Sequence, residues 1–420
     1  WLFHATNRDT FFEPAKRNKT TGTARFLAFY AIRLPTFFHE DPKIFNLGIS
    51  FVFTILLIGS IQNCSHPRPA ADTSGPAAAA APATTGSSVL IAPAVSVSAV
   101  SASGNQGFED ATRLITSAGG NVFLLSANWQ DLEATPGRIQ LQSGLSGPLT
   151  VLSKFTKLEG IVYVLKMIDS NVRVMPSDLQ GLPFDDPTVL ARFEALIEAI
   201  AADPNSARLT HILLGNEVDG YLGQHSAEVP AFLTLLNLGI KRIHQKMPNV
   251  KVGTIITANG AKQDPSLFAS LNKNTDFIDY TYYPDTGDIK GNSTLKMKPM
   301  SEIVNDLEFL AQNAGKKPFA FTEIGCSSAG SYGSSEDVQA QFVSEVFRVL
   351  KPYRTQGQVA FLIYQLLYDY APDLCGPYAA QQGVSADAIC DLMNNAGLRR
   401  YSDGQPKKAW DVFLKELTNW

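Results

Sequence analysis

Two glutamates, Glu217 and Glu323, stand where apolar runs turn abruptly polar. THILLG (210–215) is followed by Asn216 and Glu217, and FAFTEI (319–324) contains Glu323. Either motif alone is weak, because an Asn-Glu pair turns up about once by chance in a chain of this length. Two carboxyl groups that face each other over a cleft could cleave a glycosidic bond, since one protonates the leaving oxygen while the other attacks the anomeric carbon. The question is whether the fold brings these two side chains together.

The elements that would position them alternate along residues 89–420. Short β-rich apolar runs predict eight strands, at 89–97, 121–127, 160–167, 210–215, 250–256, 276–283, 319–324 and 359–364. Amphipathic stretches predict eight helices, at 108–118, 142–155, 187–202, 228–246, 264–271, 300–314, 335–353 and 407–418. Strands that are apolar on both faces favour a parallel sheet covered by helices, so this α/β pattern predicts a (β/α)8 TIM barrel. The alternative, an open doubly wound sheet, usually carries a phosphate loop that this sequence lacks.

In a TIM barrel the active site lies at the carboxyl ends of the strands. The glutamates end strands 4 and 7, which lie on opposite sides of the barrel mouth, so their side chains are expected to converge. The other polar or aromatic residues at predicted strand ends are Asn128, Trp129, Lys166, Asp169, Asn216, Tyr282, Tyr283, Tyr364 and Gln365. Tyr368 and Asp369 follow shortly after strand 8, where they line the cleft or pack the last loop.

Simpler structural interpretations stand beside these. Lys166 and Asp169 are expected to form an ion pair at the end of strand 3, although Lys166 stays a candidate substrate ligand. Trp129 either contacts substrate or caps the barrel. Asp131 and Glu133 are expected to be cap or turn residues.

Several motifs resemble those of the clan A glycoside hydrolases, which are TIM-barrel retaining β-glycosidases. GNE at the end of strand 4 and TEIG at the end of strand 7 look like the acid/base and nucleophile motifs of that clan. NWQDLEATPG (128–137) resembles its Trp…Glu-Pro-x-x-Gly stretch, and TYYPDTG (281–287) is similar to a Ser-Tyr-Tyr-Pro segment of the β-galactanases. The resemblance covers about residues 90–415 and does not select one family.

The resemblance assigns roles to individual residues. Glu217 matches the general acid/base, and Glu323 matches the nucleophile. Asn216 matches the amide that hydrogen-bonds the sugar 2-hydroxyl, and Tyr283, or alternatively Tyr282, matches the tyrosine that holds the nucleophile. Asn128 and Trp129 match subsite residues. Tyr364 and Gln365 stand where the clan has a tryptophan platform, so the choice of sugar stays open.

The expected function is hydrolysis of β-linked oligo- or polysaccharides with net retention, by a monomeric barrel that needs no cofactor. Two alternatives remain: a non-catalytic carbohydrate-binding barrel, and a transglycosylase that uses the same site.

Composition and missing motifs argue against nucleic-acid binding, metal binding and other enzyme classes. The net charge is −4 and there is no basic tract, so nucleic acid is not an expected partner. The sequence has no zinc-finger or HExxH spacing, and three of its six histidines (His4, His39 and His66) precede the predicted barrel, so no metal is expected. GxSxG, Walker and GxGxxG motifs are also absent.

The first 88 residues predict export. Residues 1–43 show no periodicity and are expected to be a truncated or spurious extension. Residues 44–64 combine the apolar run IFNLGISFVFTILLIGSI with Cys64, as in a signal peptide, a membrane anchor or a lipoprotein leader. A Ser/Pro/Ala-rich linker at 65–88 then predicts a disordered tether to the outer face of a bacterial membrane. Lipidation of Cys64, simple secretion and a single anchor helix all stay open.

Export makes disulfides possible. Cys375 and Cys390 lie 15 positions apart in one long predicted loop after strand 8, so they are expected to pair. Cys326 is the competing partner for Cys375.

Overall fold

The computed structural model describes residues 89–101, 104–286 and 295–420. The predicted extension (1–43), export segment (44–64) and linker (65–88) lie outside these ranges, as does Cys64.

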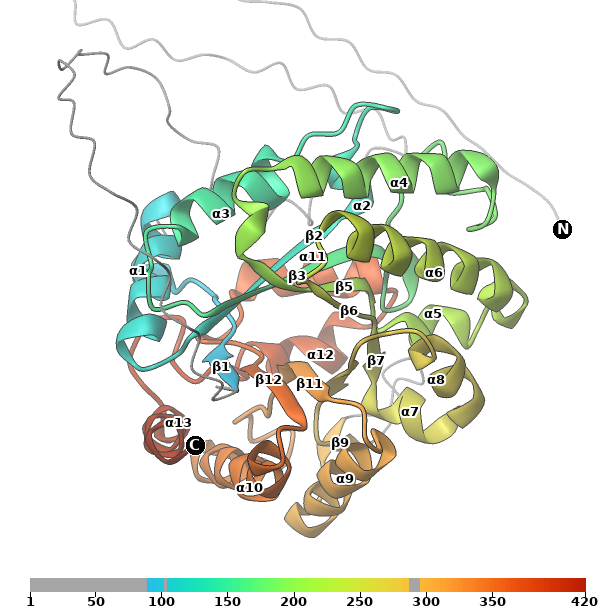
Figure 1. The fold of residues 1–420 in the computed structure, drawn as a ribbon. Coiled ribbons are helices and arrows are strands. Elements are labelled where there is room, and N and C mark those ends of the chain that lie inside the picture. Colours follow the sequence, from blue (N-terminus) through green and yellow to red (C-terminus); the bar gives the residue numbers. More distant parts are fainter. Residues whose placement is uncertain (1–88, 102–103, 287–294) are drawn as a thin grey trace, which may run out of the picture. The chain divides into compact units, whose positions relative to one another are not determined.

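A barrel of parallel strands forms the centre of the domain (Figure 1). In the described ranges its strands are β1 (Leu90–Pro93), β2 (Val122–Asn128), β3 (Gly160–Asp169), β5 (Leu209–Asn216), β6 (Lys251–Gly253) continued by β7 (Ile255–Thr257), β8 (Ile278–Tyr282), β11 (Phe319–Ile324) and β12 (Val359–Tyr364). They pair in the order β2-β3-β5-β6 and β7-β8-β11-β12-β1, with β6 and β7 forming the fifth strand of the barrel. The predicted (β/α)8 barrel is therefore confirmed, with Glu217 directly after its fourth strand and Glu323 on its seventh.

The two hydrogen-bonded sheets meet at two seams. At the first, Thr254 interrupts the fifth strand, and its hydroxyl donates to the carbonyl of Leu214 (2.8 Å). At the second, Asn121 connects β1 to β2: Ile91 N donates to Asn121 Oδ1 (2.8 Å), and Asn121 N donates to the Ile91 carbonyl (3.1 Å). In the described residues, no ladder pairing links β1 and β2 beyond this clamp.

Helices surround the strands, and each predicted helical stretch corresponds to one of them. They are α1 (Gly104–Ser117), α3 (Gly147–Leu152), α4 (Pro187–Ala202), α6 (Val229–Lys246), α8 (Pro265–Asn272), α9 (Met300–Asn313), α10 (Glu336–Thr355) and α13 (Lys408–Asn419). Several begin at side-chain caps: Asp186 Oδ1 accepts from Thr188 N (2.8 Å), and Asp264 Oδ1 accepts from Leu267 N (2.8 Å). None of the helices in the described ranges is long and apolar enough to cross a bilayer.

Short elements lie between the main ones. The helices are α2 (Trp129–Leu132), α5 (Val218–Leu222) and α7 (Ala258–Gln263). The strands are β4 (Val172–Arg173), antiparallel to β3, and the antiparallel pair β9 (Asp285–Thr286) and β10 (Lys296–Met297).

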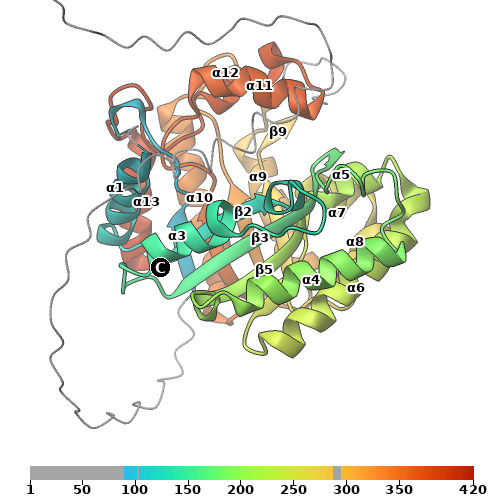
Figure 2. The ribbon, with the colours of Figure 1, turned by 90° about the horizontal axis from the view of Figure 1, so that it is seen from above.

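The structure departs from the prediction in three places. The first strand ends at Pro93 rather than at residue 97. The stretch predicted as one helix at 142–155 is a π-helical turn (Gln142–Ser146) followed by the short α3. The segment after β12 is not a long loop but contains two helices, α11 (Pro372–Gln382) and α12 (Ala386–Met393), which lie together at one end of the barrel (Figure 2).

Candidate active site

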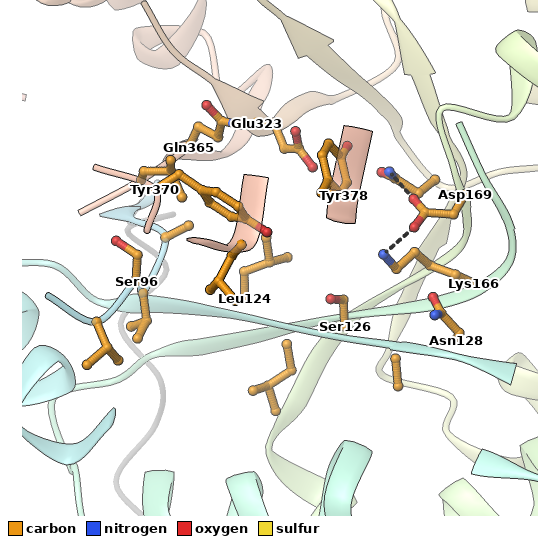
Figure 3. A pocket seen from close by; sticks show the side chains of 18 of the residues that line it. Ser96, Leu124, Ser126, Asn128, Lys166, Asp169, Glu323, Gln365, Tyr370 and Tyr378 are labelled. Carbon is orange, nitrogen blue, oxygen red and sulfur yellow. Dashed lines mark hydrogen bonds and ion pairs between the residues drawn. The ribbon is translucent and has the colours of Figure 1, made fainter. Parts of the chain in front are cut away.

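A cavity of about 310 Å³ opens at the carboxyl ends of the strands (Figure 3). Polar side chains from five strands reach it: Asn128, Lys166, Asp169, Asn216, Glu323 and Gln365. The remaining wall comes from the chain after β1, from α1, from β2, from residues 143–148 and from the segment after β12. The cavity therefore lies where a TIM barrel carries its active site, and most of the predicted polar strand ends line it.

Glu217 caps α5 in an unusual backbone conformation. Its φ of 45° and ψ of 46° are left-handed, a conformation that non-glycine residues adopt rarely and that carries strain. Its carboxyl accepts two hydroxyl hydrogen bonds, from Ser170 Oγ (2.6 Å) and Thr281 Oγ1 (2.7 Å). Glu217 is partly exposed and stands beside the cavity, whereas Asn216 before it lines the wall. The two hydroxyls thus fix the carboxyl of Glu217 at the end of β5.

Glu323 lies on β11 and lines the cavity, where Tyr283 holds it through a hydrogen bond from its hydroxyl to Oε2. The sheet register explains this contact, because Glu323 is the partner of Thr281 on β8, and Tyr283 follows two residues later on the same face. Thr281 is thus hydrogen-bonded to Glu217 and paired in register with Glu323. One residue of β8 therefore connects the two glutamates.

Burial and mutual repulsion disfavour full ionisation of this pair. Burial raises the pKa of Glu217, and the hydrogen bonds from Ser170 and Thr281 oppose that rise. Burial and then the negative charge of Glu217 raise the pKa of Glu323 to about 7, against the Tyr283 hydrogen bond. Burial therefore disfavours the charged form of each carboxyl, and a charge on Glu217 further disfavours ionisation of Glu323. Such a pair loses its two protons in separate steps, which is what an acid and a carboxylate in one site require.

The predicted ion pair at the end of β3 is confirmed. Lys166 Nζ lies 3.0 Å from Asp169 Oδ2, and both side chains are largely buried in the cavity wall. Asp169 Oδ1 accepts a hydrogen bond from Asn216 Nδ2 (2.9 Å), which orients the amide of Asn216. The Lys166–Asp169 ion pair therefore helps to hold the Asn216 amide in place.

Three predicted substrate ligands point away from the cavity. Trp129 is fully buried: its indole N–H donates to Glu133 Oε2 (2.8 Å), and its ring packs against Phe193. The expected contact of Trp129 with substrate is therefore wrong, and the alternative of a capping residue holds. Glu133 has the expected structural role, since it also accepts from Gly137 N (2.7 Å) and pairs with Arg192 (2.8 Å).

Tyr282 and Tyr364 are the other two corrections. Tyr282 alternates with Thr281 and Tyr283 along β8, so it faces the outer helices, and its hydroxyl donates to Asp306 (3.1 Å). Tyr364 is buried, and its hydroxyl donates to the Cys326 carbonyl (3.2 Å). Neither tyrosine lines the cavity.

The segment after β12 supplies side chains that the strand-end pattern did not predict. Tyr378 on α11 lines the cavity beside Glu323 and Asp169 (Figure 3). Burial, followed by the charges of Asp169, Glu217 and Glu323, raises the pKa of Tyr378 well above its usual value, so its hydroxyl stays protonated. The motif CGPY (375–378) could have indicated this position, because Cys375 and Tyr378 are three positions apart and so share one face of a helix.

A disulfide fastens this segment. Cys375 and Cys390 are bonded, with their Cα atoms 5.5 Å apart, as predicted, and the bond links α11 to α12. Cys326 is buried and forms no disulfide within the described residues. Asp369, at the start of the segment, is buried and pairs with Lys407. Tyr368 is also buried, with its ring against Arg399.

Ser170 and Thr281 also escaped the prediction. The sequence gives little indication of either residue, because hydroxyl residues near strand ends are common. Ser170 contacts Glu217 in a part of the fold where both residues have left-handed backbone angles. Across the described residues, no group of three or more histidine, cysteine, aspartate or glutamate side chains is arranged to hold a metal ion.

No protein-family model matches the chain, and no curated protein matches it in sequence. Solved structures do match. A GH5_18 protein from Streptomyces cattleya in complex with Manb1-4GlcNAc is 13% identical, with a TM-score of 0.55 over 74% of this chain and 76% of that one. An exo-beta-1,4-mannosidase from Opitutaceae bacterium strain TAV5 is 16% identical, with a TM-score of 0.59 over 79% of this chain and 59% of that one.

A family 39 glycoside hydrolase from Bacteroides cellulosilyticus WH2 is 15% identical, with a TM-score of 0.53 over 78% of this chain and 63% of that one. The chain thus spans less than two thirds of the length of the last two proteins. At these identities the likeness establishes the fold, and the predicted resemblance to clan A glycoside hydrolases is confirmed at that level.

Proposed function

We propose that this protein is a retaining glycoside hydrolase that acts on β-glycosides. The observation that carries the proposal is the position of Thr281, hydrogen-bonded to Glu217 on one side and in register with Glu323 on the other. This arrangement supports two carboxyls close enough to act on the same anomeric centre, as retention with a covalent intermediate requires. The shared fold of the glycoside hydrolases is consistent with it.

The reaction proceeds in two displacements. A Glu323 carboxylate oxygen attacks C1 of the sugar, and the C1–O bond to the leaving group breaks as Glu217 transfers its proton to that oxygen. Glu217, now ionised, removes a proton from water, whose oxygen attacks C1 and displaces Glu323. The first step leaves a glycosyl-enzyme, and the second restores both carboxyls and releases the sugar with its original configuration.

Neighbouring groups fit these roles. The Tyr283 hydroxyl stabilises the ionised form of Glu323 and fixes its orientation. Asn216, whose Nδ2 donates to Asp169 Oδ1, lines the cavity and is available to a sugar hydroxyl. Gln365 and Tyr378 also line the cavity and offer further polar contacts.

The test is a screen of nitrophenyl β-glycosides with wild type, Glu217→Gln and Glu323→Gln. Each variant should lose at least about 10²–10⁴ of kcat, while Glu308→Gln, on the exposed face of α9, should keep it. Proton NMR should show the β-anomer forming first. If both active-site variants keep wild-type rates on a glycoside that the enzyme hydrolyses, the proposal is wrong.

Reaction with azide distinguishes the acid/base from the nucleophile. With Glu217→Ala, azide should attack the glycosyl-enzyme and give a β-glycosyl azide, because the acid/base is missing but the nucleophile is present. With Glu323→Ala it should give the α-azide instead. The opposite pattern would exchange the roles of the two residues. Sugar acceptors added to wild type test the transglycosylase alternative, which requires transfer products to exceed hydrolysis.

Export of the protein remains part of the proposal. The Cys375–Cys390 disulfide supports it, because such bonds persist in oxidising compartments outside the cytosol.

A further inference from the structure

The side chains of β11 do not alternate strictly between the two faces of the barrel wall. Phe319 and Phe321 face outward, since their rings pack against each other and the ring of Phe319 also packs against Tyr353 of α10. Ile324 faces the same outer layer, against α10. With a strict period of two residues, Glu323 would lie on the outward face with Phe319 and Phe321. It lines the cavity instead (Figure 3).

A β-bulge explains the direction of Glu323. Phe321 pairs with Tyr280 of β8, and the next pair is Glu323 with Thr281, so β11 advances by two residues where β8 advances by one. Thr322 is the extra residue, and it is paired with neither neighbouring strand. Bulges are frequent next to active sites, where they turn a side chain to the other face. Glu323 therefore reaches the cavity because Thr322 is inserted before it.

Asp279 on β8 provides hydrogen-bond acceptors to the inserted residue. It lies two positions before Thr281, on the same inward face, and is fully buried. Its Oδ1 accepts from both Thr322 N (3.2 Å) and Thr322 Oγ1 (2.6 Å). A bulge leaves the extra residue without a ladder partner, so these two bonds fix Thr322 where the ladder does not.

The second oxygen of Asp279 shows which form of the carboxyl is present. Asp279 Oδ2 is buried and has no hydrogen-bond partner among the described residues. Burial raises the pKa of Asp279 well above its usual value, against the hydrogen bonds from Thr322, and the negative charge of Glu323 adds to the rise. The carboxyl is therefore neutral, and what Thr322 needs from it is an acceptor oxygen rather than a charge.

We propose that Asp279 is a positioning residue for the nucleophile, because through Thr322 it holds the bulge that turns Glu323 into the cavity. The inference rests on the proposed function and adds to it a residue that contacts neither the substrate nor the carboxyl of Glu323.

One face of β8 then organises the whole catalytic pair. Asp279 fixes the backbone before Glu323 through Thr322, Thr281 donates to Glu217, and Tyr283 donates to the carboxyl of Glu323.

The test measures the attack of Glu323 on the sugar directly. The reagent is a 2,4-dinitrophenyl 2-deoxy-2-fluoro-β-glycoside of the sugar that the nitrophenyl screen identifies. A Glu323 oxygen bonds to C1 as the C1–O bond breaks and dinitrophenolate leaves, and the fluorine slows hydrolysis of the glycosyl-enzyme. Released dinitrophenolate gives the labelling rate, and peptide mass spectrometry locates the label. Because dinitrophenolate leaves without a proton, this rate does not depend on Glu217.

Three variants separate the acceptor from the charge. Asp279→Leu removes the acceptor and should slow labelling by roughly 10²-fold, the loss expected when a reacting group is misplaced by about 1 Å. Asp279→Asn keeps an acceptor oxygen for Thr322 and should label within about threefold of wild type. Thr322→Val removes only the hydroxyl and should slow labelling about two- to tenfold. The Ki of the free sugar should stay within about threefold in all three, because the change affects attack rather than binding.

Thr275→Val is the matched control. Thr275 is also buried, and its hydroxyl donates to the Asn272 carbonyl (3.2 Å) before the amino end of β8, far along the strand from Glu323. It should lower Tm as Thr322→Val does and leave the labelling rate unchanged. The double variant Asp279→Leu with Thr322→Val should label no more slowly than Asp279→Leu alone, because both changes break the same anchor.

The positioning role is overturned if Asp279→Leu labels at the wild-type rate, if Asp279→Asn loses as much as Asp279→Leu, or if Thr275→Val slows labelling as much as Thr322→Val. If Asp279→Leu does not fold, Thr322→Val and Asp279→Asn decide, and a wild-type rate in Thr322→Val counts against the proposal. In all these cases wild type is still labelled at Glu323, so the glycosidase stands. If wild type hydrolyses no glycoside and takes no label, the proposed function itself fails.

Discussion

Two walls of the same cavity are built in different ways. The wall at the ends of β3, β5, β8 and β11 is held by short hydrogen bonds between residues on or next to strands, as in the contact of Tyr283 with Glu323. The opposite wall comes from α11 and α12, which are fastened by the Cys375–Cys390 disulfide. The barrel register fixes the first wall, whereas the second belongs to a segment after β12 whose two helices are crosslinked to each other. We therefore expect damage to the first to reduce kcat, and damage to the second to raise KM.

Removal of the Tyr283 hydroxyl should have the largest effect. Tyr283→Phe deletes a hydrogen bond to a carboxylate, a contact worth about 1.5–3 kcal/mol, so kcat should fall roughly 10- to 150-fold. Tyr282→Phe is the matched control, because the hydroxyl of Tyr282 bonds Asp306 on the outer side. Steady-state kinetics of both variants measure the difference, and equal losses would show that the alternation along β8 is not what places Tyr283.

Loss of the disulfide should come next. The crosslink closes a loop of 15 residues, so Cys375→Ser with Cys390→Ser should lower the stability of the segment by about 3 kcal/mol. KM should rise several-fold more than kcat falls, because Tyr378 and Leu374 move with α11. Kinetics with and without dithiothreitol check this, since reductant should affect wild type and not the double variant. A kcat effect alone would place the segment in the catalytic step.

Tyr378→Phe should have a smaller effect. It removes one hydroxyl from the cavity and keeps the ring, so KM should rise about two- to tenfold with little change in kcat. Tyr401→Phe, in the same part of the chain but outside the cavity lining, is the control. If kcat falls and KM does not change, Tyr378 acts on the transition state and the contrast between the two walls does not hold.

The smallest expected effect concerns stability. The pKa of Glu323 rises from 4.5 to about 7 on folding, so the folded protein binds this proton more tightly than the unfolded chain does. The stability gained from this proton is present below about pH 4.5 and is lost as pH rises through about 7. Glu323→Gln should therefore have a Tm a few degrees above wild type at pH 8, with the difference shrinking toward pH 5. Thermal unfolding over this range measures it, and parallel Tm curves would contradict the raised pKa.

Several features of the fold and the site follow from local sequence. The strands are apolar on both faces and alternate with amphipathic helices, and that pattern has few stable solutions apart from a helix-covered parallel barrel. Once the eight strands are counted, the barrel geometry places Glu217 and Glu323 at the mouth, because strands 4 and 7 end there. The pairing of Cys375 with Cys390 also followed, from their position in one segment.

Tertiary structure decided which aromatic side chains reach the cavity. Trp129, Tyr282 and Tyr364 have the right residue types at strand ends, yet each turns into the protein to satisfy its polar atom against Glu133, Asp306 or the Cys326 carbonyl. Tyr282 and Tyr364 are the last residues of β8 and β12, and Trp129 is the first residue after β2. Which way each ring turns depends on the exact strand register and on partners far away in the sequence, and the pattern of strand ends does not encode either.

Tyr378 and the apolar side chains of the cavity lining are the opposite case, because the sequence pattern did not mark them and yet they reach the cavity. Tyr378 lies 55 positions after Glu323 in the chain and reaches the same cavity only because α11, which is crosslinked to α12, folds back over the barrel mouth. The apolar residues that follow β1, and those on α1 and β2, look like ordinary core in the sequence. In the folded protein they line a cavity at the carboxyl ends of the strands, and only the closure of the barrel brings these distant segments together.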